Sequence, residues 1–337
     1  LRRSRGLGDV YKRQILDRES KIMKIKVCQL CAVDFSVFMF LTPLIDEMKK
    51  NEWDVDIICS KGKYSEKLIK AGYNFQFVKI DRSFNIFKLF YSIFNVYKIL
   101  IKEKYDVVHV HSPIASIIGR IASKIAGVPL VVYTAHGFYF HDDMPKLKYL
   151  FYFMIEKILG NLTDLIFTQS LEDYNKAIKS KFLSKNKIYF IGNGVSLKKF
   201  NPIVNQRTLN RYKEKLYIPK DSFVIGTICR LVKEKGLVEF LKAAELILND
   251  YPKTFFLLIG ERLSSDYDQS IRKELNFAKN KMKKNLKLLG ERNDIRELIA
   301  IMDLFCLPSW REGMPRTVIE AMMMRKPVIG TNIRGSR

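Results

Sequence analysis

Imidazole side chains are gathered in one short stretch of this sequence. All four histidines lie between positions 109 and 141. His109 and His111 alternate on a predicted strand and therefore face the same side of the sheet, with His111 at the strand's end. His136 holds the equivalent place after the next predicted strand. Because open α/β sheets bind ligands at the carboxyl ends of their strands, we expect His111 and His136 to line one crevice and His109 to pack in the core.

The same cluster could instead hold a metal ion. The His-x-His pair is followed by His136, His141, Asp142 and Asp143, which are ligand types found in hydrolase metal centres. The short segment from 136 to 141 would have to fold back tightly, and no further ligand is obvious elsewhere. A metal-dependent hydrolase built on His109, His111 and His136 stays open as an alternative.

Two cations follow a predicted strand in the second half of the chain. Arg230 and Lys235 lie in a turn that opens a helix beginning near Lys235. Free amides at a helix start, together with two cations, make a site suited to a diphosphate. The alternative is a solvated, charged loop.

A pair of carboxylates lies in the segment 307–322. A strand ends near Leu307, Gly313 allows a tight turn, and Pro315 fits the first position of a helix. Glu312 then falls in the loop and Glu320 about one turn into the helix, so both can project toward one crevice. Carboxylates accept hydrogen bonds from hydroxyl groups, and sugars and ribose are the obvious donors.

The elements that position these residues alternate between β-branched runs and helical periods, which is the signature of parallel, doubly wound sheets. We predict an α/β protein with two Rossmann-like domains. The predicted strands cover residues 25–30, 54–59, 75–80, 106–111, 130–135, 165–170 and 188–193 in the first series, and 223–230, 255–260, 285–290, 303–308 and 327–331 in the second.

The domain boundaries follow from these two series. Residues 1–22 are Arg-rich and without period, and we interpret them as a non-native or disordered leader. Residues 23–198 form an N-terminal domain, 199–221 a linker, and 222–337 a C-terminal domain. The second series stops early, so we expect this second domain to be truncated at its C-terminus.

Composition narrows the classes of protein further. The chain has 337 residues, 47% of them hydrophobic, and 59 basic against 35 acidic side chains give a net charge of +24. This composition excludes a disordered chain, and no run reaches the roughly 18 apolar residues of a spanning helix. Because no nucleic-acid-binding module is present, the charge favours a polyanionic substrate or an anionic membrane surface, although a non-enzymatic basic binder of membranes or nucleic acid stays open. The five cysteines indicate a reducing cytoplasm, with Cys28 and Cys31 packed in the core.

Two segments bear on a membrane contact. Residues 86–101 carry an apolar stripe that we expect to pack on the sheet, formed by Ile86, Leu89, Phe90, Ile93, Tyr97, Leu100 and Ile101. Residues 144–160 are aromatic nearly all round, between Lys146, Lys148 and Lys157. That helix favours contact with anionic headgroups through Tyr149, Phe151 and Phe153, and the alternative is a helix wedged between the sheet and a neighbouring helix.

Taken together, the motifs resemble a known family. They are an E-x7-E pair after PSxxEGxP, Arg and Lys five apart in the first turn of the second domain, HVHSP, AHGF and IGNGV. In combination they are similar to the retaining family 4 glycosyltransferases of the GT-B fold, from about residue 23 to the last residue. The resemblance is greatest to bacterial enzymes that build exopolysaccharide, capsule or other glycans on a polyprenyl-diphosphate lipid.

The resemblance implies a reaction and its partners. A hexose or N-acetylhexosamine passes from a nucleotide-sugar, with UDP-sugar expected, to a lipid-linked glycan acceptor, and the leaving phosphate accepts the acceptor's proton. Neither a cofactor nor a metal ion is then required, and nucleic acid is no partner. We expect a cytoplasmic protein, peripheral at the inner face of the cytoplasmic membrane.

The resemblance also implies that residues 23–198 are the acceptor-side domain and residues 222–337 the nucleotide-sugar-binding domain. It implies roles for individual residues as well. Glu312 contacts hydroxyls of the transferred sugar, with Gly313 and Met314 beside it on the donor side, and Glu320 contacts the ribose. Arg230 and Lys235 hold the diphosphate and stabilise the charge of the leaving group.

Further implied roles lie around the base, the donor sugar and the acceptor. The turn containing Glu291 and Arg292 approaches the base through its backbone. His111 meets the donor sugar's 6-position and joins Glu312, Arg230 and Lys235 as a catalytic residue, while His136 and Gly137 line the acceptor side.

Overall fold

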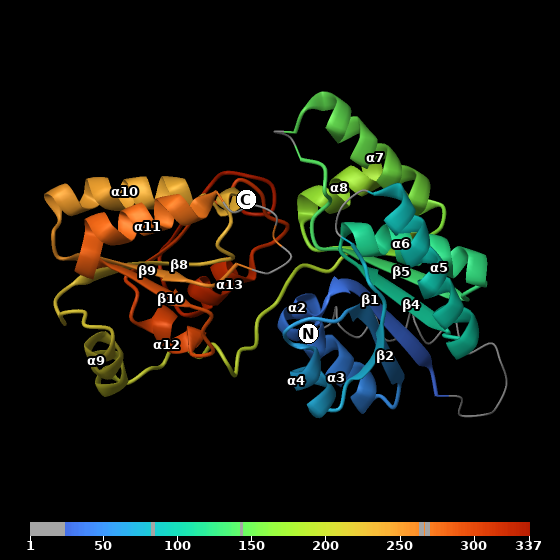
Figure 1. Cartoon of the computed structure of the whole chain (residues 1–337), viewed down its shortest axis with the longest axis horizontal. Coiled ribbons are helices and arrows are strands. Elements are labelled where there is room, and N and C mark those ends of the chain that lie inside the picture. The colour runs from blue at the N-terminus through green and yellow to red at the C-terminus, as the bar shows by residue number, and fades with distance from the viewer. Residues whose placement is uncertain (1–23, 82–84, 142–143, 263–265, 267–269) are drawn as a thin grey trace.

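The computed structural model describes residues 24–81, 85–141, 144–262, 266 and 270–337, which form two α/β domains (Figure 1). The predicted leader, residues 1–22, and the candidate metal ligands Asp142 and Asp143 lie outside the described residues. Each strand predicted from the sequence is present, with ends that shift by a few residues. The predicted fold class, two Rossmann-like domains, is confirmed.

The first domain is built on seven parallel strands in the order β3-β2-β1-β4-β5-β6-β7. They are β1 (Lys26–Val33), β2 (Asp54–Ser60), β3 (Asn74–Phe77), β4 (Val107–His111), β5 (Leu130–Ala135), β6 (Leu165–Thr168) and β7 (Ile188–Phe190). Every residue of β4 and β5 is buried, as expected of central strands that are covered on both faces. The predicted site residues His111 and His136 therefore stand at the carboxyl ends of two neighbouring central strands.

Helices cover both faces of this first sheet. One face packs against α2 (Asp34–Ser36), the π-helix η1 (Val37–Leu41), α3 (Thr42–Lys50) and α4 (Ser65–Lys70). The other packs against α5 (Ile86–Glu103), α6 (Pro113–Ala126), α7 (Lys146–Gly160) and α8 (Leu171–Lys179), and a short 3-10 helix, η2 (Lys185–Lys187), precedes β7. Cys28, Cys31 and Cys59 lie in these two cores as free thiols, as predicted for the first two.

The second domain has five parallel strands in the order β10-β9-β8-β11-β12. They are β8 (Phe223–Ile228), β9 (Thr254–Ile259), β10 (Leu286–Gly290), β11 (Leu304–Leu307) and β12 (Val328–Gly330). One face is covered by α10 (Leu237–Asp250) and α11 (Ile271–Met282), the other by α9 (Gln206–Lys215), α12 (Ile295–Ala300) and α13 (Arg316–Met323). The 3-10 helices η3 (Lys233–Lys235) and η4 (Lys283–Asn285) complete the elements of this domain within the described residues.

The segment between the two series of strands packs with the second domain. Phe200 and Ile218 are buried in the core beneath α12 and α13, and Leu209 and Tyr212 of α9 pack against the same core. Residues 199–221, predicted to be a linker, thus contribute apolar side chains to the hydrophobic core of the second domain.

The apolar stripe predicted for residues 86–101 packs on the sheet only in part. Ile93 and Leu100 are buried, but Ile86, Phe90 and Ile101 are exposed. The helix is rotated about its axis so that Ser92 and Val96 face the core, and this turns one edge of the predicted stripe toward solvent. The expectation that all of this stripe is covered was wrong.

Helix α7 also divides its aromatic residues between core and surface. Tyr149 and Phe153 pack at the margin of the core, in an aromatic cluster with Phe140 and Phe182. Phe151 is exposed. Of the three aromatics that the sequence analysis assigns to a membrane contact, two are therefore occupied in packing the first domain.

Candidate functional site

Glu312 lies in the loop between β11 and α13 and is held by two polar neighbours. Lys235 Nζ donates to Glu312 Oε1 at 2.8 Å, and Ser309 Oγ donates to the same oxygen at 2.6 Å. The Lys235 and Glu312 side chains are both largely buried, so solvent and salt screen this ion pair only weakly. The structure thus brings together two predicted site residues that are far apart in the sequence.

The turn that carries Lys235 depends on a glycine. Gly236 has a φ of +68°, and a Cβ atom there would lie 1.8 Å from the carbonyl oxygen of Pro308. Only glycine lets the turn come this close to the end of β11, where the Glu312 loop begins. Helix α10 then starts at Leu237, close to the position predicted from the sequence.

Arg230, the second predicted cation, is engaged by two carboxylates. Its guanidinium donates to Glu234 at 3.0 Å and to Asp266. Glu234 also accepts from Arg311 at 3.2 Å, so it bridges two arginines. An anionic ligand at this turn would compete with these carboxylates, as it would with Glu312 for Lys235.

Glu320 is buried in the second turn of α13. The helix begins at Arg316, and Pro315 precedes it rather than taking the predicted first helical position. Burial raises the pKa of Glu320, against the opposing charges of Arg316 and Lys199. The nearest guanidinium nitrogen of Arg316 is 3.6 Å away, too far for a hydrogen bond. This carboxylate keeps the capacity to accept hydrogen bonds from a hydroxyl group.

The three predicted histidines form a continuous network, in which His109 and His111 are buried and His136 is partly buried. His111 Nδ1 is 3.0 Å from His136 Nε2, and His111 Nε2 is 2.7 Å from the side-chain oxygen of Gln29 on β1. His109 Nε2 is 2.7 Å from Thr134 Oγ1, and its ring lies 4.1 Å from that of His111. His109 is buried, as predicted, and stacks against the network.

Burial favours the neutral form of all three imidazoles. Burial lowers the pKa of His109 to about 3 and that of His111 well below its ordinary value, and it also lowers the pKa of His136. When the Gln29 oxygen accepts from His111 Nε2, a neutral His111 must accept at Nδ1 from His136 Nε2. Gln29 therefore sets the tautomer of both rings.

The ring nitrogens do not converge as metal ligands do. Within the described residues, no group of three or more His, Cys, Asp or Glu side chains is placed to hold a metal ion. The nitrogens of His111 point instead to Gln29 and His136. The geometry thus gives no support to the hydrolase alternative.

Comparison with known proteins identifies the family. The family model described as "Glycosyl transferase 4-like" matches residues 26–170, and the one described as "Glycosyl transferases group 1" matches residues 209–337. The chain is 36% identical, over 86% of its length and 74% of the relative's, to the UDP-Gal:alpha-D-GlcNAc-diphosphoundecaprenol alpha-1,3-galactosyltransferase of Escherichia coli. The chain belongs to the family 4 glycosyltransferases.

Other relatives of this glycosyltransferase are also bacterial glycosyltransferases. It is 29% identical to the capsular polysaccharide biosynthesis glycosyltransferase CapM of Staphylococcus aureus, over 87% of the chain and 75% of CapM. It is 28% identical to the N,N'-diacetylbacillosaminyl-diphospho-undecaprenol alpha-1,3-N-acetylgalactosaminyltransferase of Campylobacter jejuni, over 89% of the chain and 78% of that enzyme.

Solved structures share the GT-B fold of this glycosyltransferase. HepE of Anabaena, in complex with UDP and glucose, superposes with a TM-score of 0.72 at 21% identity, covering 93% of this chain and 82% of HepE. A glycosyltransferase from Rickettsia africae gives 0.70 at 23% identity over 93% and 81% of the two chains. At these identities the likeness concerns the fold alone.

The two domains of the glycosyltransferase touch at a pair of glycines. A Cβ atom on Gly313 would lie 1.8 Å from the carbonyl oxygen of His136, and one on Gly137 would lie 2.7 Å from the Cα atom of Gly313. Gly137 has a φ of +109°, whereas Gly313 does not have a positive φ. Gly313 is therefore required for the close approach of two backbones, and the tight turn predicted from the sequence is not the reason for it.

Side chains also cross between the domains, among them Asn193, Arg316 and Arg334. Asn193 Nδ2 donates to the carbonyl oxygen of Met314 at 3.1 Å, and Arg316 donates to the backbone of Met39 in the first domain at 2.5 Å. Arg334 donates to the Phe138 carbonyl at 2.8 Å and lies 3.3 Å from the buried Asp173. The predicted donor-side and acceptor-side residues thus face one another across the interface between the two domains.

The turn after β10 contacts the first domain through a side chain. Glu291 accepts from Tyr64 Oη at 2.6 Å and pairs with Lys63 at 2.7 Å, and these contacts lower its pKa against the effect of burial. Arg292 pairs with the neighbouring Asp294. The contact of this turn with a base, through its backbone, stays a prediction.

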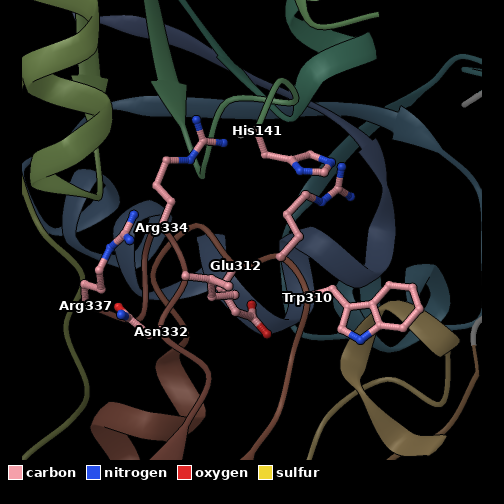
Figure 2. A pocket seen from close by; sticks show the side chains of 8 residues that line it. His141, Trp310, Glu312, Asn332, Arg334 and Arg337 are labelled. Atoms are coloured by element: carbon pink, nitrogen blue, oxygen red, sulfur yellow. The ribbon is translucent and has the colours of Figure 1, made fainter. Parts of the chain in front are cut away.

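A cavity of about 160 Å³ lies beside Glu312, between the two domains (Figure 2). His141 lines it from the first domain, and the second domain contributes Trp310, Arg311, Glu312, Asn332, Ile333, Arg334 and Arg337. Its lining is thus rich in hydrogen-bond donors next to the carboxylate that the family resemblance assigns to the transferred sugar.

Sequence reasoning missed the residues that hold the predicted ones in place. Gln29, Glu234 and Asp266 each bind a predicted site residue, yet each is a common polar residue with no spacing that marks it. Ser309 belongs to the PSxxEGxP motif, which could have indicated its hydrogen bond to Glu312. Asn193 is part of the IGNGV motif, and that motif alone could have indicated its contact with Met314.

Among the described residues, no helix combines the length and the apolarity needed to cross a membrane.

Proposed function

We propose that this glycosyltransferase moves a hexose or N-acetylhexosamine from a UDP-sugar to a lipid-linked glycan acceptor, with retention of configuration, in the synthesis of cell-surface polysaccharide or glycan. The observation that carries the proposal is the ion pair between Lys235 and Glu312, which joins the predicted diphosphate turn to the predicted sugar carboxylate. A cation and a hydroxyl acceptor side by side fit a sugar attached to a phosphate.

In this proposal the second domain binds the donor. Arg230 and Lys235 exchange their carboxylate partners for the diphosphate and stabilise the charge that develops on it as the sugar leaves. Glu312, with Gly313 and Met314 beside it, accepts hydrogen bonds from hydroxyls of the sugar, and Glu320 accepts from the ribose. The turn at Glu291 and Arg292 lies against the base through its backbone.

The first domain supplies neutral imidazoles and the acceptor side. Burial lowers the pKa values of His111 and His136, so these rings act through hydrogen bonds to uncharged hydroxyls. Both ring nitrogens of His111 are engaged, so His111 must release Gln29 or His136 to meet the 6-position of the donor sugar. His136 with Gly137 lines the acceptor. The leaving phosphate accepts the proton of the attacking hydroxyl, so no metal ion or cofactor enters the scheme.

The names of the relatives support the class of acceptor. Two of them act on sugars attached to diphosphoundecaprenol, one as a galactosyltransferase and one as an N-acetylgalactosaminyltransferase. An acceptor of this kind resides in a membrane, and we therefore place the protein at the inner face of the cytoplasmic membrane as a peripheral protein.

A panel of UDP-sugars tests the proposal. The protein is incubated with UDP-galactose, UDP-N-acetylgalactosamine, UDP-glucose or UDP-N-acetylglucosamine, together with N-acetylglucosamine joined through diphosphate to a short lipid. Mass spectrometry detects the product, and NMR of the new linkage gives its anomeric configuration. We expect transfer from at least one donor, and transfer from none of them would contradict the proposal.

A matched pair of variants tests the site. Glu312→Gln removes the charge from the Lys235 pair, and Glu47→Gln removes a charge from an exposed pair on α3. We expect at least a tenfold loss of rate for Glu312→Gln, because one lost charge-assisted contact is worth about 1.5 to 3 kcal/mol. Equal rates for the two variants would contradict the assignment of Glu312.

A further inference from the structure

Helix α5 presents a row of aromatic side chains to solvent. Phe87, Phe90, Tyr91 and Phe94 each expose more than half of their surface. Their spacing of three and four residues places them on one side of the helix, opposite Ser92 and Val96, which face the core. Helix α5 is thus apolar on both sides, whereas the sheet covers only one of them.

Helix α7 carries a second row of the same kind. Its exposed apolar residues again follow a spacing of three and four, and they are Leu147, Leu150, Phe151, Met154 and Ile158. They lie on the side of the helix away from Tyr149 and Phe153, whose rings pack at the margin of the core. The aromatic residues in the core therefore leave a separate apolar row exposed at the surface.

The two rows belong to one layer of the first domain. Helices α5, α6 and α7 pack against the same face of the sheet, and α6 is the most buried of the three. The guanidinium of Arg120 on α6 is buried against Glu156 of α7 at 2.9 Å, which ties these two helices together. Figure 1 shows α5, α6 and α7 together on the side of the first domain away from α3 and α4.

The combined area of the two exposed rows is large for a monomer. An aromatic side chain can bury about 150 to 250 Å², so one that is more than half exposed leaves roughly 100 Å² in water. The four aromatics of α5 alone then match the largest apolar patch of a typical monomer, about 300 to 600 Å². The row on α7 adds further apolar area to the same layer.

The charges around both rows are basic. Lys98 and Lys102 are exposed on α5, as are Lys146, Lys148 and Lys157 on α7. Residues 86–103 and 146–160 are described throughout, and they contain two carboxylates, Glu103 and Glu156. Glu103 pairs with Lys26 and Glu156 with Arg120, so neither opposes an anionic surface.

The exposed rows begin at the edge of the sheet that carries the candidate site. In a parallel α/β domain each helix begins at the carboxyl edge of the sheet, where His111 and His136 stand. The most exposed residues of the two rows, Phe87 and Leu147, lie in the first turns of α5 and α7. His141, which lines the cavity beside Glu312, precedes α7 by a few residues.

We propose that the exposed rows of α5 and α7 together form the surface by which this protein binds an anionic lipid bilayer. Apolar side chains enter the boundary between headgroups and acyl chains, and the bordering lysines contact the headgroups. The proposal rests on the proposed function only for its biological setting, since that function needs an acceptor held in a membrane. Binding itself follows from the surface alone.

Co-sedimentation with vesicles tests this surface. The full chain is mixed with vesicles of phosphatidylcholine containing about a third phosphatidylglycerol, at about 0.1 M and about 1 M salt, where the Debye length is about 10 and 3 Å. The α5 variant carries Phe87→Ser, Phe90→Ser and Phe94→Ser, and the α7 variant carries Leu147→Ser, Leu150→Ser and Phe151→Ser. A matched control replaces exposed apolar residues of the second domain, with Leu246→Ser, Tyr251→Ser and Phe277→Ser.

We expect the wild type and the control to pellet at low salt, and each surface variant to need more than tenfold more lipid. High salt or vesicles without the anionic lipid should weaken binding of the wild type. If a triple variant fails to fold by circular dichroism, the single changes Phe87→Ser and Leu147→Ser replace it. Surface variants that pellet as the control does would overturn the proposal.

Two further measurements separate the other outcomes. If sedimentation equilibrium finds a wild-type dimer that the surface variants break, and the wild type does not bind vesicles, the surface covers a second copy of this chain and the proposal fails. A transfer assay with a water-soluble acceptor isolates the proposed function. Surface variants should keep the wild-type rate there and lose it on vesicle-bound acceptor, whereas no transfer by the wild type would refute the proposed function alone.

Discussion

Replacing Gly313 with alanine should slow the enzyme while leaving nucleotide binding intact. The new methyl group would lie 1.8 Å from the carbonyl oxygen of His136. To restore ordinary contact, the two backbones must separate by about 1.5 Å, and neither atom belongs to a flexible side chain. The turn beside Glu312 then moves away from the turn that carries His136.

The expected loss follows from this displacement. A shift of about 1 Å in a reacting group can cost roughly a hundredfold in rate, which corresponds to about 2.7 kcal/mol in the activation barrier. The residues proposed to bind the nucleotide, Arg230, Lys235 and Glu320, all belong to the second domain and keep their places. The affinity for UDP should therefore change less than twofold.

Steady-state transfer and calorimetric titration with UDP measure the two quantities. Gly330→Ala is the matched control, because a Cβ atom at Gly330 lies at an ordinary 3.7 Å from the nearest neighbour. If Gly313→Ala keeps the kcat of the control, the close contact of Gly313 with His136 is no part of the working enzyme. A parallel loss of UDP affinity would instead place the damage in the donor site.

Three other predictions follow from the site. Glu320→Ala should weaken UDP binding roughly tenfold or more, since a hydrogen bond from ribose to a carboxylate is worth about 1.5 to 3 kcal/mol; unchanged affinities for UDP, GDP and ADP would rule out this role. Transfer should persist in excess EDTA, because Arg230 and Lys235 take the place of a cation, and a loss restored by manganese or zinc would contradict that. The free energy of unfolding should fall as the pH drops below about 6.5. The unfolded chain then protonates its histidines, while burial holds the pKa of His109 at about 3 and lowers those of His111 and His136; each contributes up to about 1.4 kcal/mol per pH unit. Equal urea midpoints at pH 7 and pH 5.5 would refute this last expectation.

The fold could be predicted because its signals are local. Buried parallel strands appear as short apolar runs, and those ending at His111, Ile228 and Leu307 are recognisable in the sequence without knowledge of their neighbours. The carboxyl ends of such strands meet by topology, so the sequence could also predict that the histidines share one place.

The partners of the site residues could not be predicted, because they depend on tertiary contacts. Asp266 and Gln29 contact Arg230 and His111 only once each domain has folded. The need for Gly313 arises from the opposite domain, so its own neighbours in the sequence suggested a turn instead. The rotation of α5 is likewise decided by packing against α6 and the sheet, which a periodic pattern of apolar residues leaves open.

The carboxylates that hold Arg230 and Lys235 already compensate both positive charges. In the proposed function a diphosphate displaces Glu234, Asp266 and Glu312 as partners of these cations, but the displaced carboxylates stay attached to the chain. Binding then makes the site more negative, so the displaced Glu312 must find new hydrogen-bond donors. Hydroxyls of a bound sugar supply such donors, whereas inorganic phosphate offers none and gains little. The proposed site thus favours a nucleotide-sugar over free phosphate.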